Sequence, residues 1–185
     1  MNTKTNFKSD YINFDTAKNT ALTLLSNPKK EKIGLYILTA IYSGLRTGDI
    51  QSLTWEQLES DSLTISEEKT NKLRTIDIHP ELRKAINKTR KGQSGLIFIS
   101  QKNSVYTTQA LNRILKDEFK ILAKKENIST HSLRKTFGRR VYDMNGQSES
   151  SLILLSEMFS HSNIQVTRIY LGLKKEEFRN VYLNL

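Results

Sequence analysis

The sequence predicts a mainly α-helical α+β domain that contains a small three-stranded antiparallel sheet. Its 185 residues are enough for a single domain with one hydrophobic core. Glycine and proline are scarce, with 8 and 2 residues, which favours helices over a turn-rich all-β fold. Apolar residues recur at helical spacing along most of the chain, whereas a few short segments alternate as strands do.

Most of the chain is expected to form the helices of one domain spanning residues 14–185. Residues 1–13 are polar, basic and without periodicity, so we interpret them as a linker or tail. The segment 30–45 is apolar on nearly every side, which predicts a buried central helix. The helices are expected to have N-caps that include Asp15, Thr107, Thr130 and Ser162. In chain order, the predicted helices cover residues 15–27, 30–45, 80–91, 107–127, 131–144, 149–159, 162–170 and 174–185.

The strand signals lie in the middle of the chain. Residues 62–66 and 73–78 each alternate between apolar and polar side chains, and a polar turn at 69–72 lies between them. This pattern predicts a β-hairpin. The short apolar segment 96–99 is expected to add the third strand.

The charge balance points to a polyanionic partner. Lysine and arginine total 29 against 19 acidic residues, which gives a formal net charge of +10. Nucleic acid is the commonest polyanion inside a cell, and a merely basic protein surface is the alternative. A membrane surface fits less well, because the basic residues are spread along the chain and form no single cationic amphipathic helix.

The composition also excludes several classes of chemistry. With no cysteine, the chain has no disulfide, no catalytic thiol and no cysteine-based zinc site, and a total of three histidines argues against a histidine-rich metal site. The longest apolar run, residues 33–42, is too short to span a bilayer. No apolar signal region follows Met1, so we expect a cytoplasmic protein.

Six polar residues set among the apolar segments are candidates for a functional site. Taken singly, each has an ordinary structural interpretation. Arg46 follows the central helix and could satisfy that helix's last carbonyls. His131 and Arg134 lie three residues apart in the first turn of a helix and could form a surface pair. In chain order the six are Arg46, Lys69, His131, Arg134, His161 and Tyr170.

Taken together and in this order, the six residues resemble the catalytic signatures of the tyrosine recombinase (phage integrase) family. The resemblance lies in Gly-Leu-Arg-Thr-Gly-Asp-Ile (44–50), His-Ser-Leu-Arg (131–134) and Ser-His-Ser-Asn-Ile-Gln-Val-Thr-Arg-Ile-Tyr (160–170). The hairpin segment 69–78 matches the family's strand-turn lysine in type and place. The resemblance covers roughly residues 13–175, which is the family's whole catalytic domain. His-x-x-Arg alone is a weak signal, but the ordered set is a strong one.

The resemblance implies a site-specific DNA recombinase or integrase. In the family, a tyrosine hydroxyl attacks a DNA phosphodiester and leaves a 3′-phosphotyrosyl link and a free 5′-hydroxyl, which later attacks the link on a partner strand. The bond energy is retained, so no nucleotide cofactor is expected, and two guanidiniums can stabilise the extra negative charge on the phosphate without a metal. The implied partners are double-stranded DNA and further copies of the chain, assembled on DNA as a tetrameric synapse.

The resemblance also assigns roles to individual residues. Tyr170 is the implied nucleophile. Arg46 and Arg134 would hold the nonbridging phosphate oxygens, because each guanidinium offers planar paired donors. The other implied roles are Lys69 as general acid for the 5′-oxygen, His131 as phosphate donor or proton acceptor, His161 as phosphate ligand, Asp49 as support for Arg46, and Lys72 and Arg74 as DNA contacts.

The chain departs from the family pattern in three respects. Asp49 replaces the usual glutamate, which shortens the carboxylate, and Ser160 replaces a glycine before the second histidine. Residues 1–13 are too short to be the helical core-binding domain of most members, so we expect a catalytic fragment, with the short fimbrial-inversion recombinases as the alternative. Two alternative functions also remain, a catalytically inactive DNA-binding module and a type IB topoisomerase-like enzyme.

Overall fold

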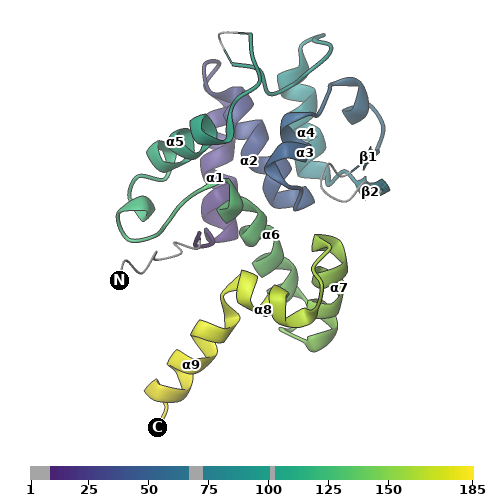
Figure 1. The fold of residues 1–185 in the computed structure, drawn as a ribbon. Coiled ribbons are helices and arrows are strands. Elements are labelled where there is room, and N and C mark those ends of the chain that lie inside the picture. The colour runs from purple at the N-terminus through teal and green to yellow at the C-terminus, as the bar shows by residue number, and fades with distance from the viewer. Residues whose placement is uncertain (1–8, 67–72, 101–102) are drawn as a thin grey trace, which may run out of the picture.

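The computed structural model describes residues 9–66, 73–100 and 103–185, with residues 174–178 described by their backbone alone. Figure 1 shows the elements up to α5 gathered at one end of the molecule, with α6 leading from them to α7, α8 and α9. In chain order the elements are α1 (Phe14–Leu25), α2 (Glu31–Ser43), α3 (Thr47–Gln51), η1 (Glu56–Leu58), β1 (Ser62–Ser66), β2 (Leu73–Asp77), α4 (Pro80–Arg90), α5 (Thr108–Glu118), η2 (Leu122–Lys124), α6 (Thr130–Met144), α7 (Glu149–Phe159), α8 (Ile164–Leu171) and α9 (Leu173–Leu183).

The prediction of a buried central helix is confirmed by α2. Leu35, Tyr36, Ile37 and Leu38 occupy four consecutive positions, which cover a full turn, and all are inaccessible to solvent. Helices α1, α4 and α6 pack around α2. A helix that is apolar on every side must be covered on every side, and these neighbours provide the cover.

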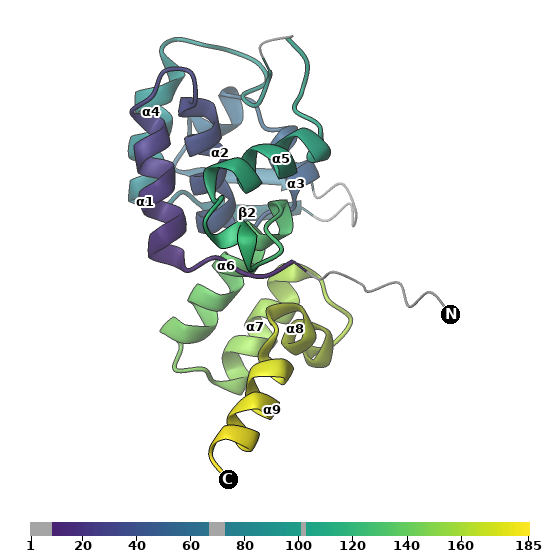
Figure 2. The ribbon, with the colours of Figure 1, turned by 90° about the vertical axis from the view of Figure 1, so that its left-hand side faces the viewer.

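Helix α6 joins two hydrophobic clusters. Its residue Leu133 belongs to the larger cluster, which is built on α1, α2, the hairpin, α4 and α5. One turn later, Phe137 belongs to a smaller cluster with Leu155, Phe159 and Leu171 from α7 and α8. Figure 2 shows the same arrangement from the side, with α6 between the two groups of helices. The polar residues that α6 carries near Leu133 therefore lie where the two clusters meet.

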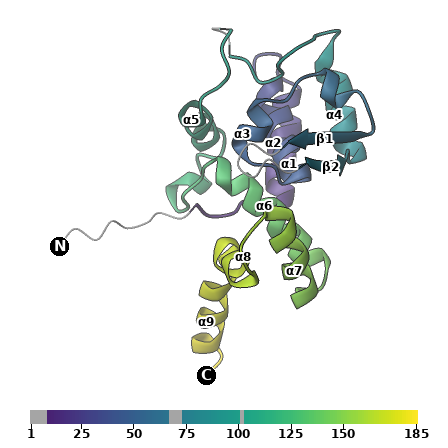
Figure 3. The same ribbon diagram turned by 45° about the vertical axis from the view of Figure 1, so that its right-hand side comes forward.

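The predicted β-hairpin is confirmed. Strands β1 and β2 pair antiparallel, in a register that sets Ser62 opposite Asp77 and Ser66 opposite Leu73. Figure 3 shows the two arrows side by side between α2 and α4. On the outer face, the hydroxyls of Thr64 and Thr75 lie 3.1 Å apart and form a cross-strand hydrogen bond.

The predicted third strand is wrong, because within the described residues the sheet has two strands. The segment at 96–99 makes isolated bridges instead, Leu96 with Thr54 and Ile99 with Val105. Ile97 and Phe98 are consecutive and both are buried, so this segment lacks the alternation of a half-exposed strand. Its apolar character reflects burial in the larger cluster and not pairing with the hairpin.

The helix boundaries differ from the predictions by a few residues. Asn13 caps α1 in place of Asp15, Ser129 caps α6 in a capping box with Ser132, and Asn163 caps α8. Each substitute is a short polar residue one to two positions before or after the expected one, and its side-chain oxygen accepts from an N–H of the first turn that follows it. The predicted helix 107–127 ends at Glu118, after which Phe119 leaves helical geometry and the short η2 follows.

Helices α2 and α7 both end in a left-handed residue. Gly44 ends α2 with a φ of 62°, and a Cβ on it would overlap the ring of Phe137. Ser160 ends α7 with a φ of 54°, so serine adopts there the turn for which glycine is the usual residue. The N–H of His161 then returns to the Ser156 carbonyl at 2.9 Å. These two helix ends form the frame of the candidate site.

Candidate active site

Three arginines far apart in the chain donate to carbonyls at the ends of α2 and α7. In the last turns of these helices, backbone N–H groups donate to the carbonyls of Ala40, Ser156 and Glu157. The carbonyls that follow, two at each helix end, accept from arginine side chains. We call the carbonyl oxygens of Ser43, Gly44, Met158 and Phe159 the carbonyl cluster. Helix C-termini carry partial negative charge and orphan acceptors, so they attract guanidinium groups.

Arg46 and Arg134 share one acceptor in this cluster. The Nη2 of Arg46 donates to the Phe159 carbonyl at 2.9 Å, and the Nη2 of Arg134 reaches the same oxygen at 3.4 Å. The Nη1 of Arg134 donates to the Gly44 carbonyl at 2.5 Å. Arg134 also lies over the Phe159 ring, 4.4 Å from its centroid. Two guanidiniums that share an acceptor oxygen lie side by side. This is the arrangement that two arginines need in order to bind the same phosphate.

The two arginines reach this place from different elements. Arg46 is half-buried and directly precedes α3, whereas Arg134 is 5% exposed in the first turns of α6. The ordinary interpretation of Arg46 was that it caps its own preceding helix. The structure places its guanidinium on the end of α7 instead, while Arg134 takes the end of α2. Each arginine therefore ties its own element to a distant one.

Tyr170 lies on α8 with its hydroxyl buried beside these guanidiniums. Among the described residues, this hydroxyl has no hydrogen-bond partner of good geometry. Burial raises the pKa of Tyr170 to about 12, although the positive charges of Arg134 and Arg46 act in the opposite direction. The hydroxyl therefore lies close enough to both guanidiniums for their positive charges to act on it. The Tyr170 ring packs on Phe159, 5.5 Å between centroids.

His161 lies between the end of α7 and Tyr170. Its ring is 5.3 Å from the Tyr170 ring and 5.4 Å from the Phe159 ring, measured between centroids. Its Nδ1 lies 2.9 Å from the Oγ1 of Thr167, a residue with no solvent exposure. Thr167 thus fixes one edge of the imidazole and leaves Nε2 on the opposite edge.

His131 begins the same helix that carries Arg134. It lies in the first turn of α6 and is exposed. Partial desolvation lowers the pKa of His131, and the positive charges of Arg134 and Lys135 lower it further. A histidine with a lowered pKa is neutral at pH 7, and a neutral imidazole can accept a proton.

The remaining predicted site residues fall into two groups. Asp49 is 4% exposed in the first turn of α3, three residues after Arg46. Arg74, on β2, donates to the carbonyls of Met158 at 3.1 Å and Ser43 at 3.2 Å. Lys69 and Lys72 lie outside the described residues.

Two residues of the site were missed in the sequence. One is Thr167, the partner of His161. The other is Lys135, which is 7% exposed and lies with its Nζ 5.2 Å from the centroid of the Tyr170 ring. Thr167 stands inside the motif at 160–170 and Lys135 directly follows the motif at 131–134, so proximity to those motifs was the available signal. Their partners could not be read from the sequence, because the Nζ of Lys135 donates to a backbone carbonyl, that of Ser9, at 2.6 Å.

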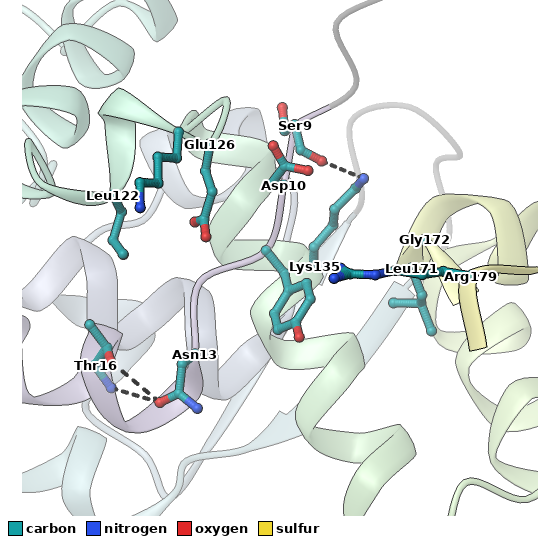
Figure 4. A pocket seen from close by; sticks show the side chains of 12 residues that line it. Ser9, Asp10, Asn13, Thr16, Leu122, Glu126, Lys135, Leu171, Gly172 and Arg179 are labelled. Carbon is teal, nitrogen blue, oxygen red and sulfur yellow. Dashed lines mark hydrogen bonds between the residues drawn. The ribbon is translucent and has the colours of Figure 1, made fainter. Parts of the chain in front are cut away.

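A cavity of about 560 Å³ has Lys135 in its lining. Figure 4 shows Lys135 extending along its wall to Ser9, with Arg179 approaching from α9. The cavity separates the segment before α1 from η2 and from the junction of α8 with α9. Its lining includes Ser9, Asp10, Tyr11, Asn13, Thr16, Leu122, Lys125, Glu126, Lys135, Leu171, Gly172 and Arg179.

None of the helices within residues 9–66, 73–100 and 103–185 is both long and apolar enough to cross a membrane. In the same described parts of the chain, no three histidine, aspartate or glutamate side chains gather as metal ligands would.

The helical fold, the arginine pair and the tyrosine on α8 together define a class of protein, the tyrosine recombinases. The sequence model of the Phage integrase family matches residues 14–177, so the chain belongs to that family. Its fold is that of the tyrosine recombinase catalytic domain.

Individual proteins similar to this chain support the assignment. The probable integrase/recombinase YoeC of Bacillus subtilis (strain 168) is 31% identical over 165 residues, which cover 85% of this chain and 86% of YoeC. The tyrosine recombinase XerC of Leptospira interrogans (serovar copenhageni) is 29% identical over 86 residues, 46% of this chain and 26% of XerC. A solved structure of the XerH site-specific recombinase bound to palindromic difH substrate, a post-cleavage complex, superposes with a TM-score of 0.67 at 20% identity. That match covers 98% of this chain and 55% of the XerH chain.

Proposed function

We propose that this chain cleaves and rejoins DNA strands as the catalytic domain of a site-specific recombinase, with Tyr170 as its nucleophile. One observation carries the proposal: Arg46 and Arg134 meet at the Phe159 carbonyl, beside the buried hydroxyl of Tyr170. A scissile phosphate that replaced this carbonyl as the shared acceptor would bring its phosphorus to the tyrosine. The DNA-bound XerH structure and the net charge of +10 support double-stranded DNA as the substrate.

In the proposed first step, the Tyr170 oxygen attacks the phosphorus and the bond to the 5′-oxygen breaks. The products are a 3′-phosphotyrosyl link and a free 5′-hydroxyl. The tyrosine proton leaves for a base, and an acid supplies a proton to the 5′-oxygen. In the second step, the 5′-hydroxyl of a partner strand attacks the link and returns the oxygen to Tyr170, so no cofactor is consumed.

The raised pKa of Tyr170 makes a base necessary. With a pKa of about 12, only about one molecule in 10⁵ carries the tyrosinate at pH 7. We assign the proton acceptor to His131, whose lowered pKa keeps it neutral at that pH. His161 would donate to the phosphate from Nε2, and Lys69 would protonate the 5′-oxygen.

The two guanidiniums would stabilise the pentavalent transition state. Each has five N–H donors in a fixed plane, and the extra negative charge develops on the nonbridging oxygens that they would hold. Asp49 is buried and lies three residues after Arg46 in the sequence. Its negative charge would balance the positive charge of that arginine. Lys72 is proposed to contact the DNA backbone.

The proposed assembly places several copies of the chain on one DNA site. Helix α9 follows the catalytic helix, and its last residues Val181, Tyr182, Leu183 and Leu185 are 58% to 99% exposed. Apolar side chains left in solvent are available to bury on a neighbouring copy. We propose that residues 173–185 dock on that copy.

The remaining proposals concern the extent and the place of action of the protein. Residues 14–185 form the catalytic domain, and residues 1–13 form a linker before it. The protein acts in the cytoplasm.

A covalent-adduct assay tests the proposed function. A pool of nicked duplexes with randomised sequence serves as substrate, because the nick lets the short strand diffuse away and traps the adduct. The wild-type chain is expected to form a protein–DNA adduct that survives denaturing gel electrophoresis. Tyr170→Phe should bind DNA and form none, whereas the matched control Tyr142→Phe, on α6 two turns beyond Arg134, should form it normally.

Two results would favour the alternatives. A wild-type chain that binds DNA without any adduct fits an inactive DNA-binding module. Rapid relaxation of supercoiled DNA without strand exchange between duplexes fits a type IB topoisomerase-like enzyme. An adduct that maps to another tyrosine would contradict the assignment of Tyr170.

A further inference from the structure

Arg74 occupies a position in the carbonyl cluster that DNA binding does not explain. Its Nη1 donates to the Met158 carbonyl at 3.1 Å and its Nη2 to the Ser43 carbonyl at 3.2 Å. These oxygens belong to the last turns of α7 and α2. One guanidinium from the hairpin therefore bridges the two helix ends on which the candidate active site is built.

The strand pattern explains why Arg74 faces inward. Arg74 and Ile76 are half-buried on one face of β2, while Leu73 and Thr75 are exposed on the other. Its cross-strand partner is Ile65, which is 5% exposed and packs into the larger cluster. Residues two apart in a strand share a face, so the backbone itself directs Arg74 toward the helices.

The bridge made by Arg74 lies directly beside the one made by the arginine pair. Ser43 and Gly44 are consecutive, and so are Met158 and Phe159. Arg74 takes the first carbonyl of each pair, while Arg134 and Arg46 take the second. Successive Cα atoms are 3.8 Å apart, so any sliding of α7 against α2 moves both sets of acceptors together.

We propose that Arg74 is a positioning residue that holds the ends of α2 and α7 together and thereby sets the geometry of Arg46 and Arg134. This inference rests on the proposed function. When a scissile phosphate draws the arginine pair away from Gly44 and Phe159, Arg74 still bridges the two helix ends. A lysine cannot replace it, because a single ammonium lacks the paired, planar donors that span two carbonyls.

The assignment predicts a separation between DNA binding and catalysis. The test uses Arg74→Lys and Arg74→Ala in the full chain, with the nicked duplex recovered from the randomised pool. Affinity is measured at several salt concentrations, and the rate of adduct formation is measured at saturating DNA. We expect affinities within about twofold of wild type and an unchanged salt slope. We expect both variants to form the adduct more slowly, on the order of 10²-fold, the loss typical of small misplacements in an active site.

Arg83→Lys is the matched control. Arg83 also donates to two carbonyls, those of Leu58 and Ser60, but both lie in the loop around η1. Replacing it removes a similar bridge away from the carbonyl cluster, so its adduct rate should equal that of wild type. Thermal unfolding of all variants separates a loss of folding from a loss of rate. If Arg74→Ala fails to fold, Arg74→Lys still decides the test, because its long side chain keeps the strand face covered.

Two results would overturn the assignment. If Arg74 contacts a DNA phosphate, Arg74→Ala lowers the salt slope by about 0.9, the value for one contact, and Arg74→Lys restores both slope and rate. If Arg74→Lys forms the adduct as fast as wild type, the bridge between the helix ends has no catalytic consequence. Failure of the proposed function itself looks different, since then the wild-type chain forms no adduct.

Discussion

Thr167 and His161 are joined by a half-buried hydrogen bond, with 2.9 Å between Oγ1 and Nδ1. Thr167 has no solvent exposure and lies one turn before Tyr170 on α8. The bond therefore links the orientation of the imidazole to the helix that carries the proposed nucleophile. A hydroxyl that donates to Nδ1 selects the tautomer with its proton on Nε2, which is the form that can donate to a phosphate.

Replacing Thr167 should change the orientation of the His161 imidazole while leaving the fold intact. Thr167→Val keeps the shape and removes the hydroxyl, so Nδ1 loses its partner at a cost of about 1–3 kcal/mol of stability. We expect the rate of adduct formation at saturating DNA to fall about 10- to 100-fold, the loss typical of partners that orient a functional histidine. Thr167→Ser keeps the hydroxyl and should retain most of the rate. If the valine variant is as fast as wild type, the hydrogen bond serves packing alone.

The assignment of His131 as proton acceptor predicts a pH dependence. A base must be neutral, and desolvation with Arg134 and Lys135 lowers the pKa of His131 below its ordinary value of 6.5. The adduct rate should thus be level near pH 7 and fall about tenfold per pH unit below that lowered pKa. The same shift affects folding. Because the unfolded chain binds the proton more tightly, stability is present above pH 6.5 and declines as the pH falls through that value.

His131→Gln should lower the rate by about 10² to 10⁴-fold and remove the acid limb of the pH profile. The matched control is His79→Gln. His79 caps α4 and stacks on Tyr42 with 4.3 Å between ring centroids, so its ring is held by other elements than α6 and α8 and its replacement should leave the profile unchanged. An acid limb that persists in His131→Gln would show that another group accepts the proton.

The sequence indicated which side chains come together, but not which atoms they contact. Periodicity predicted α2 as the central helix, and the order of motifs selected Arg46, Arg134 and Tyr170, which the structure brings together. The acceptors of these arginines are backbone carbonyls, such as that of Phe159. Every residue has a carbonyl, so no letter of the sequence marks the ones that matter.

What the sequence leaves out around the hairpin has a related cause. The segment 96–99 is short and apolar, which predicts a strand, but those properties suit any buried extended segment. For Arg74 the sequence indicates a DNA contact, and it gives no sign of the two helix ends that its side chain reaches. Its inward direction depends on the register of β2 against β1, which places it opposite Ile65, and register is a property of the assembled sheet.

The left-handed Ser160 predicts a stabilising substitution. Its φ of 54° and ψ of 44° lie in a region that costs a residue with a Cβ about 1 kcal/mol relative to glycine. Ser160→Gly should therefore raise the free energy of unfolding by about 1 kcal/mol and the midpoint of thermal unfolding by about 2–4 °C. Ser162→Gly is the control, because Ser162 is exposed with an ordinary φ, and it should give no gain. A lower midpoint for Ser160→Gly would mean that the serine side chain contributes more than its strain removes.

The exposed end of α9 predicts an assembly defect. Replacing Val181 and Tyr182, which are 58% and 79% exposed, by serine removes apolar surface that the single chain does not bury. We expect unchanged thermal unfolding and unchanged binding of the first copy to DNA, but fewer complexes with two or more copies in native gels. Asn180→Ser changes a polar, exposed position on the same helix and should assemble normally. Normal assembly by the double variant would contradict docking of α9 on a neighbouring copy.

The final prediction separates the two lysines of the hairpin turn. The family resemblance assigns the general acid to Lys69, because it takes the place of the family's lysine directly after the first strand, whereas Lys72 is assigned to a backbone phosphate. The 5′-alkoxide is a poor leaving group, so loss of its acid should cost about 10² to 10⁴-fold in rate. A sulfur in place of the bridging 5′-oxygen leaves without a proton. Lys69→Ala should therefore cleave normal DNA slowly and the thio-substrate at nearly the wild-type rate.

Lys72→Ala serves as the matched control for this experiment. Loss of a phosphate contact weakens binding to both substrates equally and lowers the salt slope by about 0.9, so sulfur should give no rescue. If sulfur rescues Lys72→Ala instead, the two roles are exchanged. If it rescues neither variant, the proton for the 5′-oxygen comes from outside the hairpin. Lys69 would then be an ordinary solvated turn residue, and His131 or His161, which the structure places beside Arg134 and Tyr170, would have to be tested as the acid.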